Sequence, residues 1–133
     1  MSEDRLALPV KAVQDGVNRD AEFAIAARFW NACVRFYTNE ADEYFMVIRD
    51  GRVVKFQEGS DGYQASDIYV GGPRETWRDL LAPVQPRFCN DFFPAAIHRG
   101  MRLGGDLSSL YAYYSAMQRI LAVMRQETNG AKA

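Results

Sequence analysis

Side chains suited to acid–base catalysis or metal binding are few in this chain and widely separated. His98 is the only histidine, the one residue type that ordinarily titrates near neutral pH. It stands just before Arg99 and Gly100, where a helix is expected to end, so a surface or capping role fits it better than that of a general base. Cys33 and Cys89 lie 56 residues apart, without the short paired spacings of a zinc site. We therefore expect no metal, no cofactor and no catalytic residue.

Most of the notable aspartates have a local structural explanation. Asp50 and Asp61 each precede a glycine, a pair typical of tight turns, and Asp106 stands where it can cap a helix. Asp67 and Asp91 are less well explained in this way. Either would become an acid or base candidate if it lay beside a tyrosine in a pocket with a raised pKa.

The most informative pattern is the apolar face of the closing segment from residue 107 to about 126, which predicts one long helix. Its apolar side chains sweep about 180°, whereas a helix over an ordinary core needs roughly 100°. The surplus must face a cavity, a ligand or a partner, although pockets are themselves built from core-type residues and ordinary core packing stays open. The residues expected to line a ligand pocket are Tyr111, Tyr113, Tyr114, Met117, Leu121 and Met124 of this helix, with Trp30, Val34, Phe36, Met46 and Phe56 from the facing strands.

Turn and capping residues divide the rest of the chain into short elements. Asn18 offers a cap for an early helix, and Asp50-Gly51 is a strong hairpin signal between two apolar strands. Asp61-Gly62 marks a second turn, so the first four strands are expected to form an antiparallel meander. Strands are expected at residues 29–36, 44–49, 53–56, 65–70 and 101–103, and helices at 9–16, 21–27, 73–82, 94–100 and 107–126.

Length and charge bound the classes of protein that remain. The 133 residues fit a single domain with a core at about 18–126, an N-terminal segment 1–17 and a flexible tail 127–133. A net charge of −1 disfavours nucleic acid as a partner. We expect no integral membrane segment, because no apolar run approaches about 18 residues, and no signal peptide, because Glu3 and Asp4 precede any apolar run. The cysteine spacing favours reduced thiols in a cytoplasm. We expect a monomer or a homodimer.

The order of these elements resembles the sterol carrier protein type 2 superfamily, from about residue 21 to residue 125. The residues that carry the resemblance are Val47-Ile48-Arg49-Asp50-Gly51-Arg52-Val53, Asp67-Ile68-Tyr69-Val70-Gly71-Gly72, Trp77-Arg78-Asp79-Leu80-Leu81 and Met101-Arg102-Leu103-Gly104-Gly105-Asp106-Leu107. The resemblance implies an α+β fold, with a five-stranded, mostly antiparallel sheet and helices packed on one face around an apolar tunnel for acyl chains or sterols. The segment from Pro83 to Pro94 departs from the pattern, because many relatives are shorter there.

These observations favour a binding protein over an enzyme. The leading hypothesis is non-catalytic binding and transfer of an elongated apolar small molecule, such as a lipid, fatty acyl group or sterol-like compound, between the sheet and the closing helix. A small isomerase, cyclase or hydrolase is the alternative, with Tyr113 or His98 handling a proton. A third possibility is a dimerisation or accessory module that buries the broad helix face against another chain.

Overall fold

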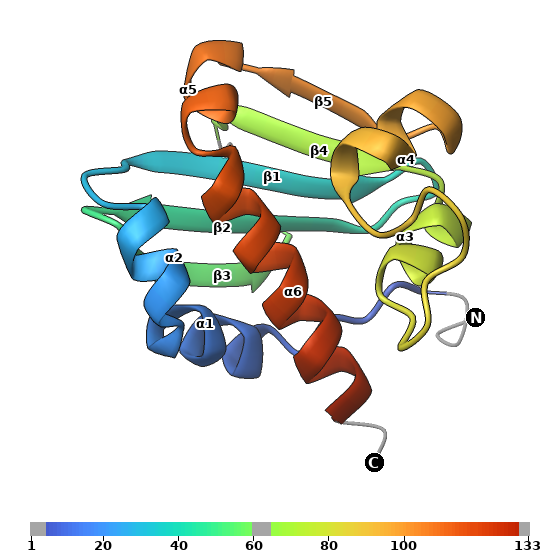
Figure 1. Ribbon diagram of the computed structural model, residues 1–133, viewed down its shortest axis with the longest axis horizontal. Helices are drawn as coiled ribbons and strands as arrows, with labels where there is room; N and C mark the ends of the chain where they lie inside the picture. Colours follow the sequence, from blue (N-terminus) through green and yellow to red (C-terminus); the bar gives the residue numbers. More distant parts are fainter. Residues whose placement is uncertain (1–4, 60–64, 131–133) are drawn as a thin grey trace.

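The computed structural model describes residues 5–59 and 65–130. The strands in these ranges are β1 (Ala32–Thr38), β2 (Glu43–Arg49), β3 (Arg52–Glu58), β4 (Ile68–Gly72) and β5 (Arg102–Gly105). The helices are α1 (Val10–Arg19), α2 (Ala21–Ala26), α3 (Arg74–Leu80), α4 (Phe92–His98), α5 (Leu107–Ala112) and α6 (Tyr114–Gly130). The helices lie on one face of the sheet, with α6 crossing the strands (Figure 1). The expected α+β fold is confirmed.

The sheet is mixed, with the strand order β3-β2-β1-β4-β5. Each neighbouring pair is antiparallel except β1 and β4, which are parallel with Val34 opposite Ile68. The expected meander of four strands is therefore wrong at its last step. The chain between Glu58 and Ile68 is long enough to return across the sheet, so β4 joins the free edge of β1 instead of pairing with β3. The expected turn at Asp61-Gly62 lies outside the described residues.

The hairpin between β2 and β3 confirms the turn expected from Asp50-Gly51. Both residues have positive φ angles, 49° and 75°, as a two-residue hairpin turn of this type requires. Glycine is also needed for space, because a Cβ at Gly51 would lie 2.7 Å from the carbonyl oxygen of Ala27. The turn therefore closes the hairpin and packs its tip against the end of α2.

The core lies between the sheet and the helices. Alternate residues of β1 and β2 face inward in register, with Val34 opposite Met46 and Phe36 opposite Tyr44. Met117 and Met124 of α6 belong to the same buried cluster. None of the helices in the described part of the chain is long and apolar enough to cross a membrane.

Two expected helices differ in the structure. Asn18 does not cap α2, because its side chain instead exchanges two hydrogen bonds of 2.8 Å with the backbone of Val53. Asp20 is the cap, since its carboxylate accepts from the Phe23 N–H at 2.8 Å. The expected long closing helix is two helices, α5 and α6, separated at Tyr113 (φ −111°, ψ 23°).

The ends of these closing helices also bear on the sequence predictions. Asp106 caps α5 as expected, because its side chain accepts from the Ser109 N–H at 3.1 Å. The last helix, α6, continues to Gly130, which is past residue 126, where the core was expected to end.

Candidate functional site

The residues expected to line a pocket fall into two groups in the structure. Eight of them are at most 5% exposed: Trp30, Val34, Phe36, Met46, Phe56, Met117, Leu121 and Met124. Trp30 lies just before β1 and the others come from the sheet and α6, so the structure does bring the two sides together. Four of the eight, Val34, Met46, Met117 and Met124, have no accessible surface, so they pack directly against other side chains in this conformation.

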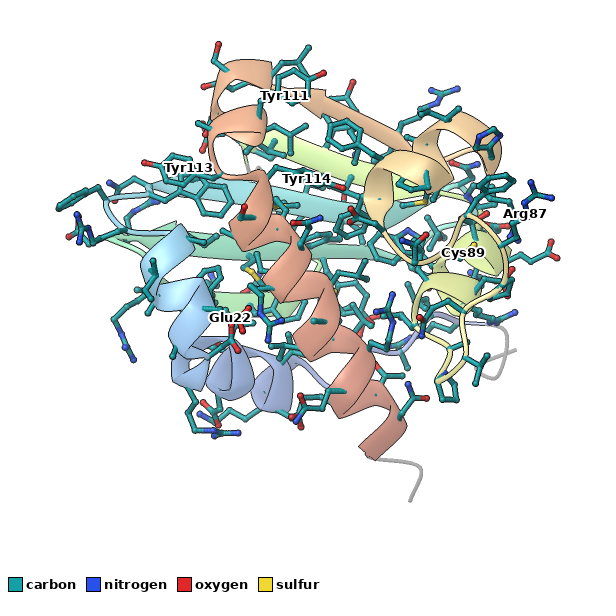
Figure 2. All side chains as sticks on the ribbon, viewed as in Figure 1. Glu22, Arg87, Cys89, Tyr111, Tyr113 and Tyr114 are labelled. Carbon is teal, nitrogen blue, oxygen red and sulfur yellow. The ribbon has the colours of Figure 1, made fainter. Side chains whose placement is uncertain are left out.

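The three tyrosines form the second group and lie on different sides of the α5–α6 junction (Figure 2). Tyr111 is 58% exposed, whereas Tyr113 and Tyr114 are partly buried. Leu107 and Tyr111 belong to α5 and point outward, so they do not share a face with the buried stripe of α6. The unusually wide apolar face of the sequence is thus the sum of two helices with different axes.

Tyr113 and Tyr114 have well-defined partners. The ring of Tyr113 stacks on Trp30 with centroids 4.9 Å apart, and Trp30 donates to the Ser109 hydroxyl at 3.1 Å. The hydroxyl of Tyr114 accepts from the Phe93 N–H at 3.1 Å. Burial, reinforced by the neighbouring Asp91, raises the pKa of Tyr114, so this phenol stays protonated.

The two unexplained aspartates have structural partners. Asp67 accepts from the Cys33 N–H at 2.7 Å, which ties the start of β4 to β1. Asp91 caps α4 through the Phe92 N–H and also accepts from Gln118, both at 2.8 Å. Asp91 does lie near Tyr114, but its own oxygens already serve as hydrogen-bond acceptors. Both carboxylates therefore stabilise the fold.

The other reactive side chains are similarly engaged. His98 ends α4 and stacks on Phe88 with ring centroids 3.8 Å apart, so it lies on a different element from Tyr113. The Cys89 thiol is buried and accepts from Arg99 at 3.0 Å. Burial raises the pKa of Cys89, which keeps the thiol neutral and a poor nucleophile.

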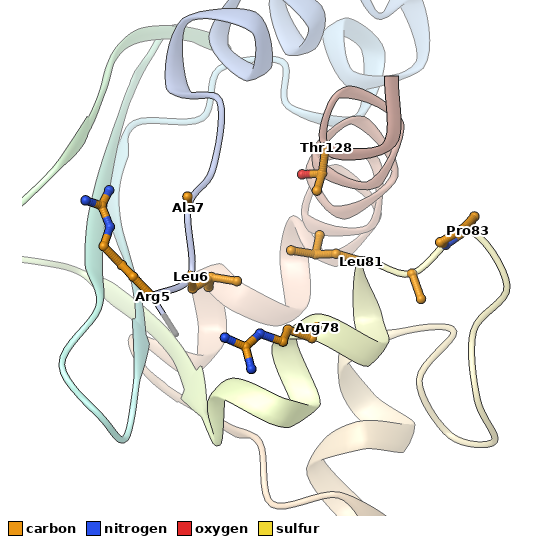
Figure 3. A pocket seen from close by; sticks show the side chains of 8 residues that line it. Arg5, Leu6, Ala7, Arg78, Leu81, Pro83 and Thr128 are labelled. Atoms are coloured by element: carbon orange, nitrogen blue, oxygen red, sulfur yellow. The ribbon is translucent and has the colours of Figure 1, made fainter. Parts of the chain in front are cut away.

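A cleft of about 410 Å³ opens where three distant parts of the chain meet. These are the segment before α1, the end of α3 with the loop that follows, and the last turn of α6. The cleft is lined by Arg5, Leu6, Ala7, Arg78, Leu81, Ala82, Pro83 and Thr128. Leu6 and Leu81 point toward one another across it (Figure 3). Sequence reasoning missed this cleft because its walls lie far apart in the chain and share no periodic pattern.

One wall of the cleft is held by a buried polar network around Asp42. Its carboxylate accepts from the Leu6 N–H at 3.1 Å, the Thr38 hydroxyl at 2.8 Å and Arg74 at 2.7 Å. Burial alone would raise the pKa of Asp42, but these hydrogen bonds outweigh it and hold the pKa below its usual value. Tyr44 adds a second attachment by accepting from the Leu8 N–H at 3.0 Å and donating to the Leu6 carbonyl at 2.8 Å.

The opposite wall is held by side chains of α6. Arg125 donates to the carbonyl of Leu80 and Asn129 to that of Leu81, each at 2.8 Å. These bonds fasten the last turns of α6 to the end of α3 and fix the width of the cleft.

The cleft combines an apolar lining with a few polar groups at its edge. Its hydroxyl, Thr128 Oγ1, is buried and has no hydrogen-bond partner among the described residues. The Arg78 side chain also lines the cleft, and Arg5 pairs with Glu58 beside it. An apolar space with guanidinium groups at its edge suits an elongated molecule with one polar end.

This fold, a mixed five-stranded sheet with helices on one face, matches that of sterol carrier protein 2 structures. A crystal structure of sterol carrier protein 2 aligns with a TM-score of 0.72 and 16% identity, over 88% of this chain and 93% of that one. A conserved hypothetical protein from Thermus thermophilus aligns with a TM-score of 0.68 and 16% identity, over 86% and 82%.

A ubiquinone synthesis protein, UbiJ, also shares the fold, with a TM-score of 0.57 and 11% identity over 86% of this chain and 90% of its own. No family model and no curated protein sequence matches the chain. The structural alignments confirm the resemblance to the sterol carrier proteins for the fold.

Proposed function

We propose that the protein binds and transfers an elongated apolar small molecule of the lipid, fatty acyl or sterol-like class. The observation that carries this proposal is the apolar cleft between the N-terminal segment, α3 and α6, whose volume of about 410 Å³ is within the range of small-molecule sites. Small-molecule sites commonly occupy roughly 300–1,000 Å³. The fold shared with sterol carrier protein 2 supports the same conclusion.

We further propose that the cleft is the entrance, and that the buried stripe of α6 becomes the ligand wall when α6 moves outward. Leu121 and Met124 precede Thr128 on the same helix, so a chain that enters past Thr128 would meet them next. The bonds from Arg125 and Asn129 to α3 would have to break, at a cost of about 0.5–1.5 kcal/mol each. Apolar ligand surface, at roughly 25 cal/mol per Å² removed from water, can offset that cost.

A ligand panel tests the proposal. Delipidated protein is mixed with palmitate, cholesterol or a polycyclic aromatic compound, and its thermal midpoint is recorded together with native mass spectra. We expect a raised midpoint and a retained one-to-one complex with at least one class. A protein that gives neither effect with any of the three classes is not a carrier of this kind.

A cleft-filling variant tests the entrance. Ala82→Phe places a ring in the cleft, so ligand affinity should fall at least tenfold. Val84→Phe is the matched control, because it adds a ring two residues away at a position that is 85% exposed. Equal affinities in the two variants would exclude the cleft as the route of entry.

A substitution at Tyr113 distinguishes a binding protein from an enzyme. Tyr113→Phe keeps the ring that stacks on Trp30 but removes the hydroxyl, so a binding protein should retain its affinity. An enzyme that uses this phenol would lose turnover while still binding its substrate. Sedimentation at micromolar concentration addresses the third possibility, because a pure monomer is incompatible with a dimerisation module.

A further inference from the structure

Four arginines without a carboxylate partner among the described residues gather at one end of the sheet. Five other arginines are each paired with an acid: Arg5 with Glu58, Arg35 with Glu43, Arg74 with Asp42, Arg99 with Asp79 and Arg119 with Asp20. By contrast, the described residues place no carboxylate within 4.0 Å of Arg19, Arg28, Arg49 or Arg52. All four side chains are exposed.

Backbone contacts bring these four residues together. Arg49 and Arg52 are directly opposite one another across the β2–β3 turn, and the Gly51 N–H donates to the Trp30 carbonyl at 3.0 Å. The turn therefore lies against the loop that carries Arg28, as the left side of Figure 1 shows. The last turn of α1 reaches the same end, because the side chain of Asn18, the residue before Arg19, is hydrogen-bonded to the backbone of Val53 in β3.

Two large apolar side chains project from the same end. Ile25 of α2 is 77% exposed, and Phe29, in the turn that follows α2, is 74% exposed. The Arg28 guanidinium lies 5.1 Å from the centre of the Phe29 ring. Phe29 also has a φ of 69°, a conformation that is strained for a bulky side chain. An exposed ring on a strained backbone does not stabilise the core, so we take Phe29 as a residue that contacts another molecule.

The local charge differs in sign from that of the whole chain. Asp50 is the acidic residue in the turn itself, while Asp20 and Glu22 near Arg19 are both engaged by Arg119. A chain with a net charge of −1 therefore presents a cationic end with protruding apolar groups. Such a charge distribution orients a molecule toward an anionic surface.

We propose that this end, which we call the arginine end (Arg19, Arg28, Arg49 and Arg52 with Ile25 and Phe29), docks on an anionic lipid bilayer. The guanidinium groups bind lipid phosphates, and the two apolar side chains enter the boundary between headgroups and acyl chains. The proposal goes beyond ligand binding in the cleft. Leu6 of the cleft attaches at Asp42, just past the other end of β1, so docking leaves the cleft accessible.

Vesicle sedimentation tests the electrostatic part. The protein should bind vesicles of phosphatidylcholine and phosphatidylglycerol in equal parts far better than phosphatidylcholine alone, and high salt should weaken the binding. Arg49→Gln with Arg52→Gln should lower the partition about 25-fold, at roughly fivefold per arginine. Arg87→Gln with Arg102→Gln removes the same charge elsewhere on the surface and should change it less than twofold. Equal losses in the two double variants would overturn the proposal.

A tryptophan at position 29 tests insertion. The native tryptophans, Trp30 and Trp77, are at most 1% exposed, so an added Phe29→Trp ring dominates any change in solvent exposure. Its emission should shift to the blue on anionic vesicles, while that of Val84→Trp should not. The proposal fails if neither emission shifts, if both shift alike, or if an RNA oligomer binds as tightly as the vesicles.

Phe29→Asn keeps this test independent of folding. Asparagine tolerates a positive φ, so the variant should melt a few degrees higher than the parent while it loses vesicle binding. Retained vesicle binding in this more stable variant would overturn the role of Phe29. The cleft variant Ala82→Phe should bind vesicles normally, so failure of ligand binding and failure of docking are distinguishable.

Discussion

The two ends of the sheet use arginine in opposite ways. At the cleft end, Arg74 is largely buried and bonded to Asp42, whose carboxylate also holds the N-terminal segment and Thr38. At the arginine end, Arg49 and Arg52 lie opposite one another across a hairpin, and no carboxylate of the described residues lies within 4.0 Å of either guanidinium group. The first arrangement stabilises the fold, whereas the second costs a little stability and leaves charge available to a partner.

This difference indicates where substitutions should act on folding and where they should act on binding. Residue type alone does not decide it, since the same guanidinium group serves both ends. The number of buried hydrogen bonds that depend on a group is the better guide.

The largest expected effect is on the Asp42 network. Asp42→Ala removes acceptors from the Leu6 N–H, Thr38 and Arg74 at once, so unfolding should cost about 3 kcal/mol less. Denaturant unfolding measures the change. Asp15→Ala is the control, because that exposed carboxylate pairs only with Lys11 in the described structure. Its loss should lower the free energy of unfolding by less than about 0.5 kcal/mol. Similar losses in both variants would contradict the comparison.

Acid should weaken the same network. The pKa values of Asp42 and Asp20 are lower in the folded protein than in the unfolded chain, so their contribution to stability is complete above the ordinary carboxyl pKa near 4. It is lost as the pH falls through the lowered folded-state values. The free energy of unfolding, followed from pH 6 downward, should decline less steeply in Asp42→Asn than in the parent protein. An unchanged slope would show that Asp42 does not couple folding to protons.

A smaller effect is expected where α6 meets α2. Arg119 donates two hydrogen bonds of 2.9 Å to Asp20, and this partly exposed pair helps lower the pKa of Asp20. Arg119→Gln should therefore cost about 1 kcal/mol of unfolding free energy. A loss as large as that of Asp42→Ala would show that exposure is a poor guide here.

The smallest effect on stability should come from giving the arginine end an arginine–carboxylate pair like those found elsewhere in the fold. Arg52→Glu places a carboxylate opposite Arg49, so stability should rise by about 0.2–1 kcal/mol. The same change should weaken vesicle binding more than Arg52→Gln does. If the variant is less stable than the parent, the cross-strand repulsion inferred for Arg49 and Arg52 is not present.

Local features of the fold could be predicted from the sequence, and non-local ones could not. The Asp50-Gly51 hairpin and the Asp106 cap depend on a few adjacent residues, and both are confirmed. The parallel pairing of β4 depends on which sheet edge is free, which no short pattern records. The α5–α6 junction meets Trp30, whose indole bonds to Ser109 across 79 positions of sequence.

The candidate site shows the same division. Of the eleven expected pocket residues, eight are buried as hydrophobic periodicity suggested, but periodicity reports burial and not whether space is left beside a side chain. The cleft needs Leu6, Leu81 and Thr128 to meet in three dimensions. Net charge likewise concealed the arginine end, because its residues are spread from position 19 to position 52.

The two tryptophans give each end of the molecule its own optical reporter. Trp30 directly follows Phe29 at the arginine end, whereas the Trp77 indole donates to the Tyr37 carbonyl near the far end of β1 at 2.8 Å. Because both rings are buried in the native state, single replacement by phenylalanine leaves one emitter whose quantum yield follows local loosening at one end alone. Stopped-flow mixing with cargo or with liposomes could then time events at the two ends separately, without any attached dye.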